Sequence, residues 1–246
     1  MEAAREIQMG MLPSRESLAA LSPEIDLRAV LEPARSIGGD LYDAFLVADG
    51  KLFFMIGDVT GKGVPASLFM ALSKALTKSA LLRAGSEFED AVLTANLEMS
   101  RENTAEMFVT GVLGLIDLST GAVALVNAGH DDPILLHGND PPTELRLEGG
   151  PPLCVMDDFP YPVEETVLHR GDMLVLTTDG VTEARDPAGE LFGHARIMAT
   201  IGELSRPATA DDAVSTVQQT VRRFEDGGAA VDDLTVMAIR YLGGDG

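Results

Sequence analysis

An α+β fold is predicted by the sequence, with helices packed in layers against mostly antiparallel sheets. Segments with strand character outnumber helical segments, and the helices come in blocks instead of alternating singly with strands. That order disfavours a parallel, doubly wound sheet. The chain has 246 residues, of which 46% are hydrophobic and 23% are charged, so it can bury a sizeable core.

The N-terminal residues predict a short helix that stands outside the main pattern. Apolar side chains recur at near-helical spacing until Pro13, which disfavours helix at the residue before it. These side chains are Ile7, Met11 and Leu12. Standing alone the helix would expose them, so we expect the stripe to be buried against the domain or a second chain. We therefore divide the chain into an N-terminal helix, residues 1–13, and one domain, residues 14–246.

Residues 25–58 predict a strand followed by a hairpin. Ile25–Leu31 alternates apolar and polar side chains, as a half-buried strand does. Leu41–Val47 and Leu52–Gly57 are apolar runs separated by a turn that contains Asp-Gly, a frequent hairpin signal. Opposed residues of a hairpin have a constant index sum, here 99 for a turn centred on that Asp-Gly pair. Asp40 and Asp58 have a sum of 98, so the two carboxylates should be near neighbours.

The remaining elements follow from the same periodicities. Further helices are expected from Pro65 over about five turns, over Phe88–Met99 and over Val214–Phe224. Further strands are expected at Phe108–Leu118, Ala122–Val126, Pro133–Leu136, Glu144–Leu147, Val163–Leu168, Met173–Thr177 and Leu234–Tyr241. The chain contains no internal repeat and no linker long enough to require two domains.

Charge and composition exclude several classes of function. The chain carries 39 acidic and 18 basic residues, a formal charge of −21, so it lacks the cationic surface that nucleic acids and anionic membranes require. Cys154 is the single cysteine, which excludes an internal disulfide and a thiolate zinc cluster. The N-terminus has no apolar core of a signal peptide, and the longest nearly uncharged run, residues 66–82, contains two lysines. We therefore expect a cytoplasmic protein without direct membrane contact.

Aspartates stand at the ends of the predicted strands. Asp40 precedes one strand, Asp58 ends the next, Asp179 follows Met173–Thr177, and Asp232-Asp233 precede the last. Two ionised carboxylates close together repel unless a cation neutralises them, so a converging set is best explained by a divalent metal. Ligation by oxygen alone suits Mg²⁺ or Mn²⁺ better than Zn²⁺. The alternative is that each Asp beside a Gly only forms a turn or a cap, and spacing alone does not decide between the two.

Five short segments stand in a fixed order: Gly38–Asp43, Gly57–Gly63, Asn127–His130, Thr178–Glu183 and Asp232–Val236. Together they resemble the SpoIIE/RsbU type of the metal-dependent protein phosphatases, bacterial relatives of phosphatase 2C. The resemblance extends from about Gln8 to the end of the chain. It implies an α-β-β-α sandwich in which two central, mostly antiparallel sheets hold a binuclear Mn²⁺ or Mg²⁺ site at one edge.

The resemblance also implies a role for each residue of the metal site. Asp58 would bridge both metals, and the carbonyl of Val59 would reach one of them. Asp179 and Asp232 would hold the other metal, while Asp40 would act mainly through a metal-bound water. The four carboxylates would be the catalytic residues in the sense that they hold the reacting metals.

Asp233 occupies the neighbouring position and would support these ligands. The implied reaction is hydrolysis of a phosphoserine or phosphothreonine ester by a hydroxide that bridges the metals, with no side-chain nucleophile. The implied substrate is a phosphorylated regulatory protein, an anti-sigma-factor antagonist of the STAS-domain type. In relatives, the helix at residues 1–13 connects an upstream sensor domain, absent from this chain, to the metal site, often in a homodimer.

Two other functions stay open: a catalytically silent binding scaffold, which the four retained carboxylates disfavour, and a hydrolase of a small phosphate ester.

Gly57–Gly63 superficially matches a P-loop, but it is one residue short and has glycine where a P-loop has Ser or Thr. Lys62 could contact a substrate phosphate or be a solvated lysine. His130 could be a general acid or a structural residue hydrogen-bonded at a turn, and Cys154 is expected to be an inert thiol where the family tends to have glycine.

Overall fold

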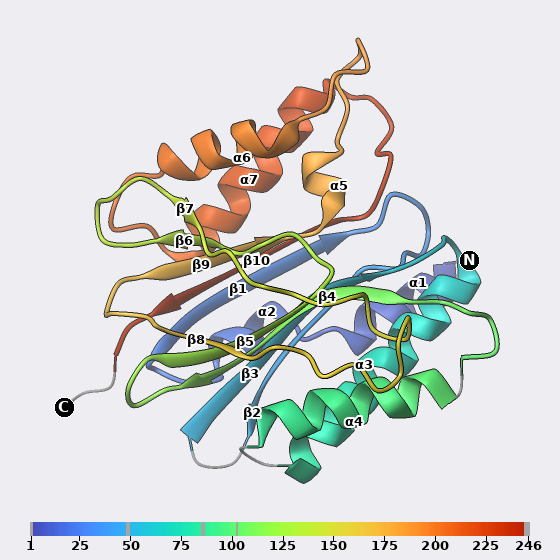
Figure 1. The fold of residues 1–246 in the computed structure, drawn as a ribbon. Helices are drawn as coiled ribbons and strands as arrows, with labels where there is room; N and C mark the ends of the chain where they lie inside the picture. Colours follow the sequence, from blue (N-terminus) through green and yellow to red (C-terminus); the bar gives the residue numbers. More distant parts are fainter. Residues whose placement is uncertain (1, 48–49, 85–86, 102, 244–246) are drawn as a thin grey trace.

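Two five-stranded antiparallel sheets pack face to face, and helices cover the outer face of each (Figure 1). The computed structural model describes residues 2–47, 50–84, 87–101 and 103–243. The predicted α+β class and the α-β-β-α layering are confirmed. Of the helices in these ranges, none combines the length and the apolar composition that a membrane-spanning segment requires.

One sheet, here sheet A, has the order β1-β10-β9-β6-β7, and the other, sheet B, has the order β2-β3-β4-β5-β8. The strands of sheet A are β1 (Ile25–Glu32), β10 (Leu234–Tyr241), β9 (Met173–Thr177), β6 (Ile134–Leu136) and β7 (Thr143–Glu144). Those of sheet B are β2 (Leu41–Val47), β3 (Lys51–Val59), β4 (Val109–Asp117), β5 (Ala122–Ala128) and β8 (Glu164–Val167).

The longer helices form the two outer layers. Helices α3 and α4 lie against sheet B, and α6 and α7 lie against sheet A (Figure 1). The helices are α1 (Glu2–Met11), α2 (Arg15–Ala19), α3 (Val64–Ala84), α4 (Phe88–Arg101), α5 (Asp179–Thr182), α6 (Gly193–Gly202) and α7 (Ala210–Glu225). Helices α2, α5 and α6 were not predicted, and the predicted strand at Glu144–Leu147 is only the two-residue β7.

Strand periodicity distributes the apolar side chains over three layers of core. In β3, Leu52, Phe54 and Ile56 face the layer between the two sheets, while Phe53 and Met55 face α3 and α4. All five are buried, so the strand is apolar on both sides. The third layer lies between sheet A and helices α6 and α7.

A buried ion pair fixes α3 on sheet B. The ammonium of Lys74 meets the carboxylate of Asp43 in β2, and both side chains are more than nine-tenths buried. Burial lowers the pKa of Lys74, and the charge of Asp43 opposes that effect. Removing one partner would leave a buried charge, which is strongly destabilising. Asp43 thus holds the helix layer and does not point to the predicted metal site.

Helix α1 packs on the domain, but through a different face from the one predicted. Ile7 and Met11 are 68% and 40% exposed, so the domain does not bury these two members of the predicted stripe, and their burial against a second chain stays a prediction. Gln8 and Leu12 are the buried side chains. The reason is polar: the side-chain amide of Gln8 donates to the carbonyl of Gly38 (2.7 Å) and accepts from its N–H (3.2 Å). This pair of hydrogen bonds turns Gln8 inward and leaves Ile7 on the surface.

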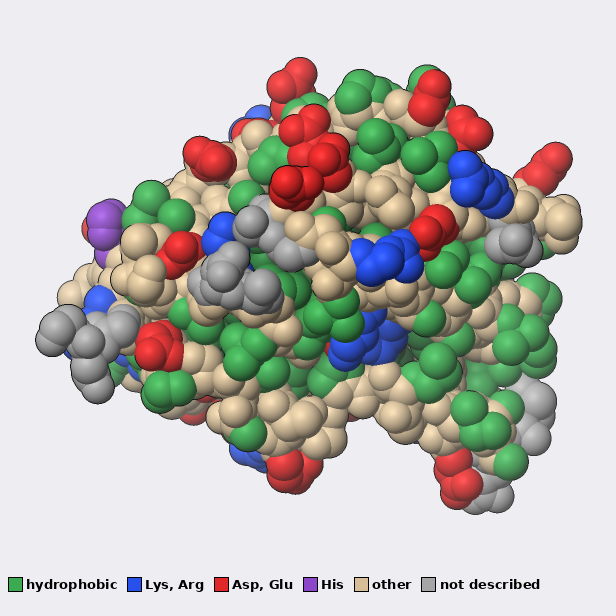
Figure 2. Space-filling model, turned by 90° about the horizontal axis from the view of Figure 1, so that it is seen from below, with side chains coloured by type: hydrophobic (Ala, Val, Ile, Leu, Met, Phe, Trp, Pro, Cys, Tyr) green, Lys and Arg blue, Asp and Glu red, His purple; other side chains and the backbone are tan. Residues whose placement is uncertain are grey.

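Charge is spread over the molecule without a continuous basic surface on the face that Figure 2 shows. On that face acidic side chains are distributed widely, a few basic ones lie among them, and hydrophobic side chains stand between. The many acidic side chains on this face agree with the net charge of −21.

Gly114 offers a test of how tightly sheet B is packed. It lies opposite Phe54, and a Cβ built on it would come within 2.1 Å of the Phe54 ring. Gly114→Ala should therefore lower the free energy of unfolding by roughly 1–3 kcal/mol. Gly10→Ala is the matched control, because its Cβ would meet nothing within 4 Å and alanine favours the helix. Urea denaturation of both variants measures the difference, and equal midpoints would contradict the packing described.

Candidate metal centre

Strand ends from both sheets bring the predicted aspartates to one edge of the sandwich. In the β2–β3 hairpin, Leu41 pairs with Gly57, so the index sum is 98 and Asp40 and Asp58 stand just beyond that pair. The predicted neighbourhood of these two residues is confirmed, although the turn residues 48 and 49 lie outside the described residues. In sheet A, Asp179 begins α5 directly after β9, and Asp232 precedes β10.

Asp40 connects the two sheets. Its side chain is 2% exposed, and its Oδ2 accepts hydrogen bonds from the hydroxyls of Thr178 (2.7 Å) and Thr235 (2.5 Å). Both threonines belong to the sheet A side, where the N–H of Thr235 also donates to the Thr178 hydroxyl (3.1 Å). Burial, and then the charge of Asp58, raise the pKa of Asp40 well above its usual value.

Asp58 is surrounded by other acids. Burial and then the nearby charge of Asp179 raise the pKa of Asp58 to about 7, and Asp232 and Asp233 add to that effect. The pKa of Asp179 is itself raised, by burial first and then by the charge of Asp232. This mutual destabilisation of the ionised forms is what a positive charge at the same place would relieve.

The other two aspartates already have partners. Asp232 forms an ion pair with the ammonium of Lys62 (2.8 Å), which also donates to the carbonyl of Val231. Asp233 accepts backbone N–H bonds on both carboxylate oxygens, from Ala34 (2.8 Å) and Gly39 (2.8 Å). The arrangement of Asp233 therefore suits support of the loop before Asp40 better than direct ligation.

Three glycines allow this crowding. A Cβ on Gly39 would stand 2.6 Å from the carbonyl oxygen of Val59 and 2.8 Å from Oδ1 of Asp58. A Cβ on Gly38 or on Gly180 would come within 2 Å of Asp233 atoms. Only glycine lets the backbone approach so closely, so these positions form a cradle of oxygen atoms that any side chain would fill.

The residues present fit a divalent metal of the Mg²⁺ or Mn²⁺ kind. In the described ranges, no three His, Cys, Asp or Glu side chains already surround one point as in a finished metal site. The donors that converge are nevertheless all oxygens, four carboxylates and the Val59 carbonyl, which is the set that hard cations select.

Three residues left open by the sequence now have defined surroundings. Lys62 is half exposed, and its ammonium forms an ion pair with Asp232, so it is not simply a solvated lysine. His130 uses both ring nitrogens, since Nε2 donates to the Thr177 carbonyl (3.1 Å) and Nδ1 accepts from the Thr110 hydroxyl (3.1 Å). Burial lowers the pKa of His130, so its surroundings favour the structural role.

Cys154 behaves as the inert thiol that was expected. Burial raises the pKa of its thiol to about 11, which keeps it protonated. Its φ of 72° lies in the left-handed region that favours glycine, which is the physical reason for expecting glycine at this position.

Sequence reasoning missed the residues that position the carboxylates. Thr178 and Thr235 lie within the motif segments, but nothing in their spacing shows that they donate to Asp40. The role of Gln8 was missed because a polar residue in a helix is normally expected to face solvent. Arg35 stands with Lys62 beside the Gly38-Gly39 loop, and only its place five residues before Asp40 could have drawn attention to it.

Comparisons with known proteins agree with this geometry. The model of the family described as Stage II sporulation protein E (SpoIIE) matches residues 48–242. Protein IcfG of Synechocystis sp. (strain ATCC 27184 / PCC 6803 / Kazusa) is 32% identical over 265 residues, which cover 97% of this chain and 41% of that protein. The phosphoserine phosphatase RsbU of Bacillus subtilis (strain 168) is 28% identical over 244 residues, 97% of this chain and 69% of RsbU. The chain thus spans about two fifths of the first relative's length.

Solved structures share the fold. The SiaA-PP2C domain of Pseudomonas aeruginosa superposes with a TM-score of 0.83 at 23% identity, covering 98% of this chain and 95% of that domain. RsbX in complex with magnesium superposes with a TM-score of 0.66 at 16% identity, covering 89% of this chain and 96% of RsbX. Since the family model covers more than half of the sequence, this chain belongs to the family described as Stage II sporulation protein E (SpoIIE).

Proposed function

We propose that this chain hydrolyses a phosphoserine or phosphothreonine ester on a regulatory protein, with two Mn²⁺ or Mg²⁺ ions held at the edge of the sandwich. The observation that carries the proposal is the convergence of Asp40, Asp58, Asp179 and Asp232 from strand ends of both sheets. Bound divalent cations would supply a water of lowered pKa and would stabilise charge on the phosphoryl oxygens. A cytoplasmic site of action stays a prediction from the sequence.

Each residue of the proposed site would have a separate role. Asp58 lies among the other acids and would face both cations, together with the carbonyl of Val59. Asp232 would exchange its Lys62 partner for a cation, which would free the ammonium to meet the substrate phosphate. Arg35 stands beside Lys62 and would add a second positive charge there. Asp40 would be kept in position by its hydrogen bonds from Thr178 and Thr235.

The substrate is proposed to be a phosphorylated protein, of the STAS-domain anti-sigma-factor antagonist type that the family resemblance implies. A hollow of about 500 Å³ lies next to the carboxylates: it is lined in part by His130 and Asp131, and the charge of Asp131 acts on Asp179. An open hollow of that size accommodates a protein segment, whereas an enclosed pocket would favour a small ester. The sigma-factor connection is supported by the similarity to RsbU.

The two alternatives make different predictions about substrates. A small-ester hydrolase would act on free phosphoserine as well as on a phosphoprotein, and a silent scaffold would act on neither nor on an aryl phosphate. We expect metal-dependent release of phosphate from a phosphorylated STAS protein at a kcat/KM well above that for free phosphoserine. Equal values for the two substrates would contradict the proposed protein substrate.

Substitution of the central carboxylates tests the site itself. Asp58→Asn and Asp179→Asn should each abolish Mn²⁺-dependent phosphatase activity, because each removes a ligand charge. The metal-free Asp58→Asn protein should be at least as stable as the parent: the folded-state pKa of about 7 exceeds the unfolded value, so ionisation of Asp58 costs stability at neutral pH. Asp158→Asn, at an exposed position, is the control. Parent-like turnover in Asp58→Asn or Asp179→Asn would contradict the assignment of these residues as metal ligands.

Metal should stabilise the folded chain. At free Mn²⁺ about a hundredfold above Kd, linkage adds about 2.7 kcal/mol to the free energy of unfolding. For a chain of this size, that corresponds to a rise of several degrees in Tm. Calorimetry of the metal-free and Mn²⁺-loaded proteins measures it, with Asp58→Asn as the variant that should not respond. An unchanged Tm at saturating Mn²⁺ would argue against a metal site.

We also propose that residues 1–13 regulate the site, in a chain whose upstream sensor and possible homodimer stay predictions. Gln8 holds the Gly38 backbone, the next amide, Gly39, donates to Asp233, and Asp40 follows directly. A movement of α1 would therefore act on the loop that positions the first carboxylate. Ile7 and Met11, exposed on the same helix, are available to a sensor segment or a second copy.

Paired substitutions in α1 separate regulation from packing. Gln8→Ala should change the Kd for Mn²⁺ or kcat in the folded fraction, because it releases Gly38. Leu12→Ala is the control: it should lower stability by about 2–5 kcal/mol and leave both quantities unchanged, since Leu12 only packs. Ile7→Asp and Met11→Asp should leave stability unaltered, and light scattering shows whether they dissociate a dimer. A monomer whose Mn²⁺ affinity and kinetics are unchanged by Gln8→Ala, Ile7→Asp and Met11→Asp would end the regulatory proposal.

A further inference from the structure

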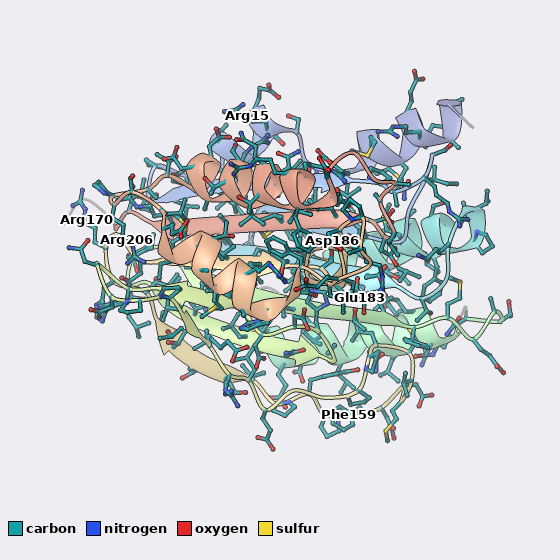
Figure 3. The ribbon with its side chains drawn as sticks, turned by 90° about the horizontal axis from the view of Figure 1, so that it is seen from above. Arg15, Phe159, Arg170, Glu183, Asp186 and Arg206 are labelled. Atoms are coloured by element: carbon teal, nitrogen blue, oxygen red, sulfur yellow. The ribbon has the colours of Figure 1, made fainter. Side chains whose placement is uncertain are left out.

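A second hollow lies at the end of sheet A that is remote from the aspartates. Its volume is about 300 Å³, and two arginines line it, Arg206 from the loop between α6 and α7 and Arg240 from the end of β10. Figure 3 shows Arg206 well separated from Glu183, which follows α5 near the metal centre. β10 runs from Leu234 to Arg240, and six steps at about 3.3 Å each put the hollow roughly 20 Å from the carboxylates.

The two guanidinium groups lack acidic partners within the part of the chain that the structure describes. Arg206 donates to the carbonyl of Gly138, and no side-chain hydrogen bond of Arg240 is found there. The arginines that do form ion pairs are Arg15, Arg28, Arg83, Arg146, Arg196 and Arg222. Arg206 and Arg240 are thus two arginines that line one hollow without an ion pair among the described residues.

The nearest acids are engaged elsewhere. Asp26, opposite Arg240 in the β1–β10 register, accepts the N–H of Ala210 (2.8 Å). Asp172, beside the first residue of β9, is buried and accepts from the N–H of His169 (2.9 Å) and from His137 (3.0 Å). Each of these two carboxylates therefore has its own hydrogen-bond donors, and neither forms an ion pair with Arg206 or Arg240 among the described residues.

The rest of the lining is mainly hydrophobic, with Asn139 as a further polar side chain. The hydrophobic lining residues are Leu136, Met173, Pro207 and Ala208. An apolar hollow of this size with a few fixed polar groups is typical of small-molecule sites. Guanidinium groups bind phosphate through paired, charge-assisted hydrogen bonds. Two guanidinium groups suit a ligand with one dianionic centre better than a ligand with a single carboxylate.

We propose that this hollow binds a small organic anion, a molecule with one phosphate-like dianionic group and a short apolar portion. The anion would meet Arg206 and Arg240, and the apolar portion would contact Met173. The volume is too small for a folded partner, and a long polyanion would be repelled by the acidic surface. The ligand is not the substrate of the phosphatase reaction, because the hollow lies at the other end of the strands.

Binding is measured on the metal-free chain with phenylphosphonate, which carries a dianion and an apolar ring and has no ester to hydrolyse. The readout is the methyl signal of Met173 in protein labelled at methionine methyl groups, assigned with Met173→Leu. Met70, buried in α3, serves as the internal reference that should not shift. Inorganic phosphate and succinate are titrated in parallel, to separate the contributions of the ring and of phosphate chemistry.

We expect saturable binding of phenylphosphonate, weaker binding of inorganic phosphate, and the weakest binding of succinate. Arg206→Gln and Arg240→Gln should each weaken phenylphosphonate binding about tenfold, as loss of one charge-assisted contact does. Arg223→Gln, an exposed arginine on α7, is the charge-matched control and should change nothing.

Three results would overturn the proposal. They are no saturable shift of the Met173 methyl with phenylphosphonate or phosphate, a shift that persists in the Arg206→Gln/Arg240→Gln double variant, and succinate binding as tight as that of phenylphosphonate. The thermal midpoint of each variant shows that it is folded. Phosphatase activity of the double variant should equal that of the parent, which keeps this result independent of the metal centre.

Discussion

The hydrogen bonds from Thr178 and Thr235 to Asp40 join the two sheets at the edge where the chemistry is proposed. Asp40 directly precedes β2 of sheet B. In sheet A, Thr178 directly follows β9 and Thr235 is the second residue of β10. Asp179 and Asp232 stand directly beside these strand ends. Because Asp40 is buried, its position is set by these hydroxyls and not by solvent. The relative placement of the aspartates from both sheets follows from this one contact.

The acids clustered at the same edge lower the stability of the metal-free fold. Acids that raise one another's pKa values are destabilising unless a cation joins them, and the glycine cradle forces them together. The rest of the chain supplies the compensation: three apolar layers, strands buried on both faces, and the Lys74–Asp43 pair that holds α3. A rigid frame of that kind can keep like charges close, which is what a metal site requires.

Much of the frame could be predicted because it depends on local periodicity. The bounds of β9 and β10 were predicted to the residue, since both are short apolar runs between polar turns. Helix α5 was missed because its four residues include Gly180, and α2 because five residues capped by Ser14 leave no periodic stripe. β7 is shorter than predicted because only Ile134 and Leu135 pair with it.

Contacts between distant segments could not be predicted in the same way. The register of one hairpin placed Asp40 near Asp58, because a short turn fixes it. The Lys62–Asp232 pair joins residues 170 positions apart, and no local pattern encodes it. The contact of α1 with the domain was missed for a related reason. Apolar spacing identified Ile7, Met11 and Leu12, of which the domain buries only Leu12, whereas the polar backbone of Gly38 binds Gln8.

The central claim is that the clustered aspartates form one binuclear metal site, and the number of Mn²⁺ ions bound per chain tests it most directly. Electron paramagnetic resonance of free Mn²⁺ during a titration counts the bound ions. The account predicts two ions per parent chain and the loss of both at the same Mn²⁺ concentrations in Asp58→Asn, because Asp58 is proposed to touch both. Two ions retained by Asp58→Asn, or no bound ion in the parent chain, would contradict it.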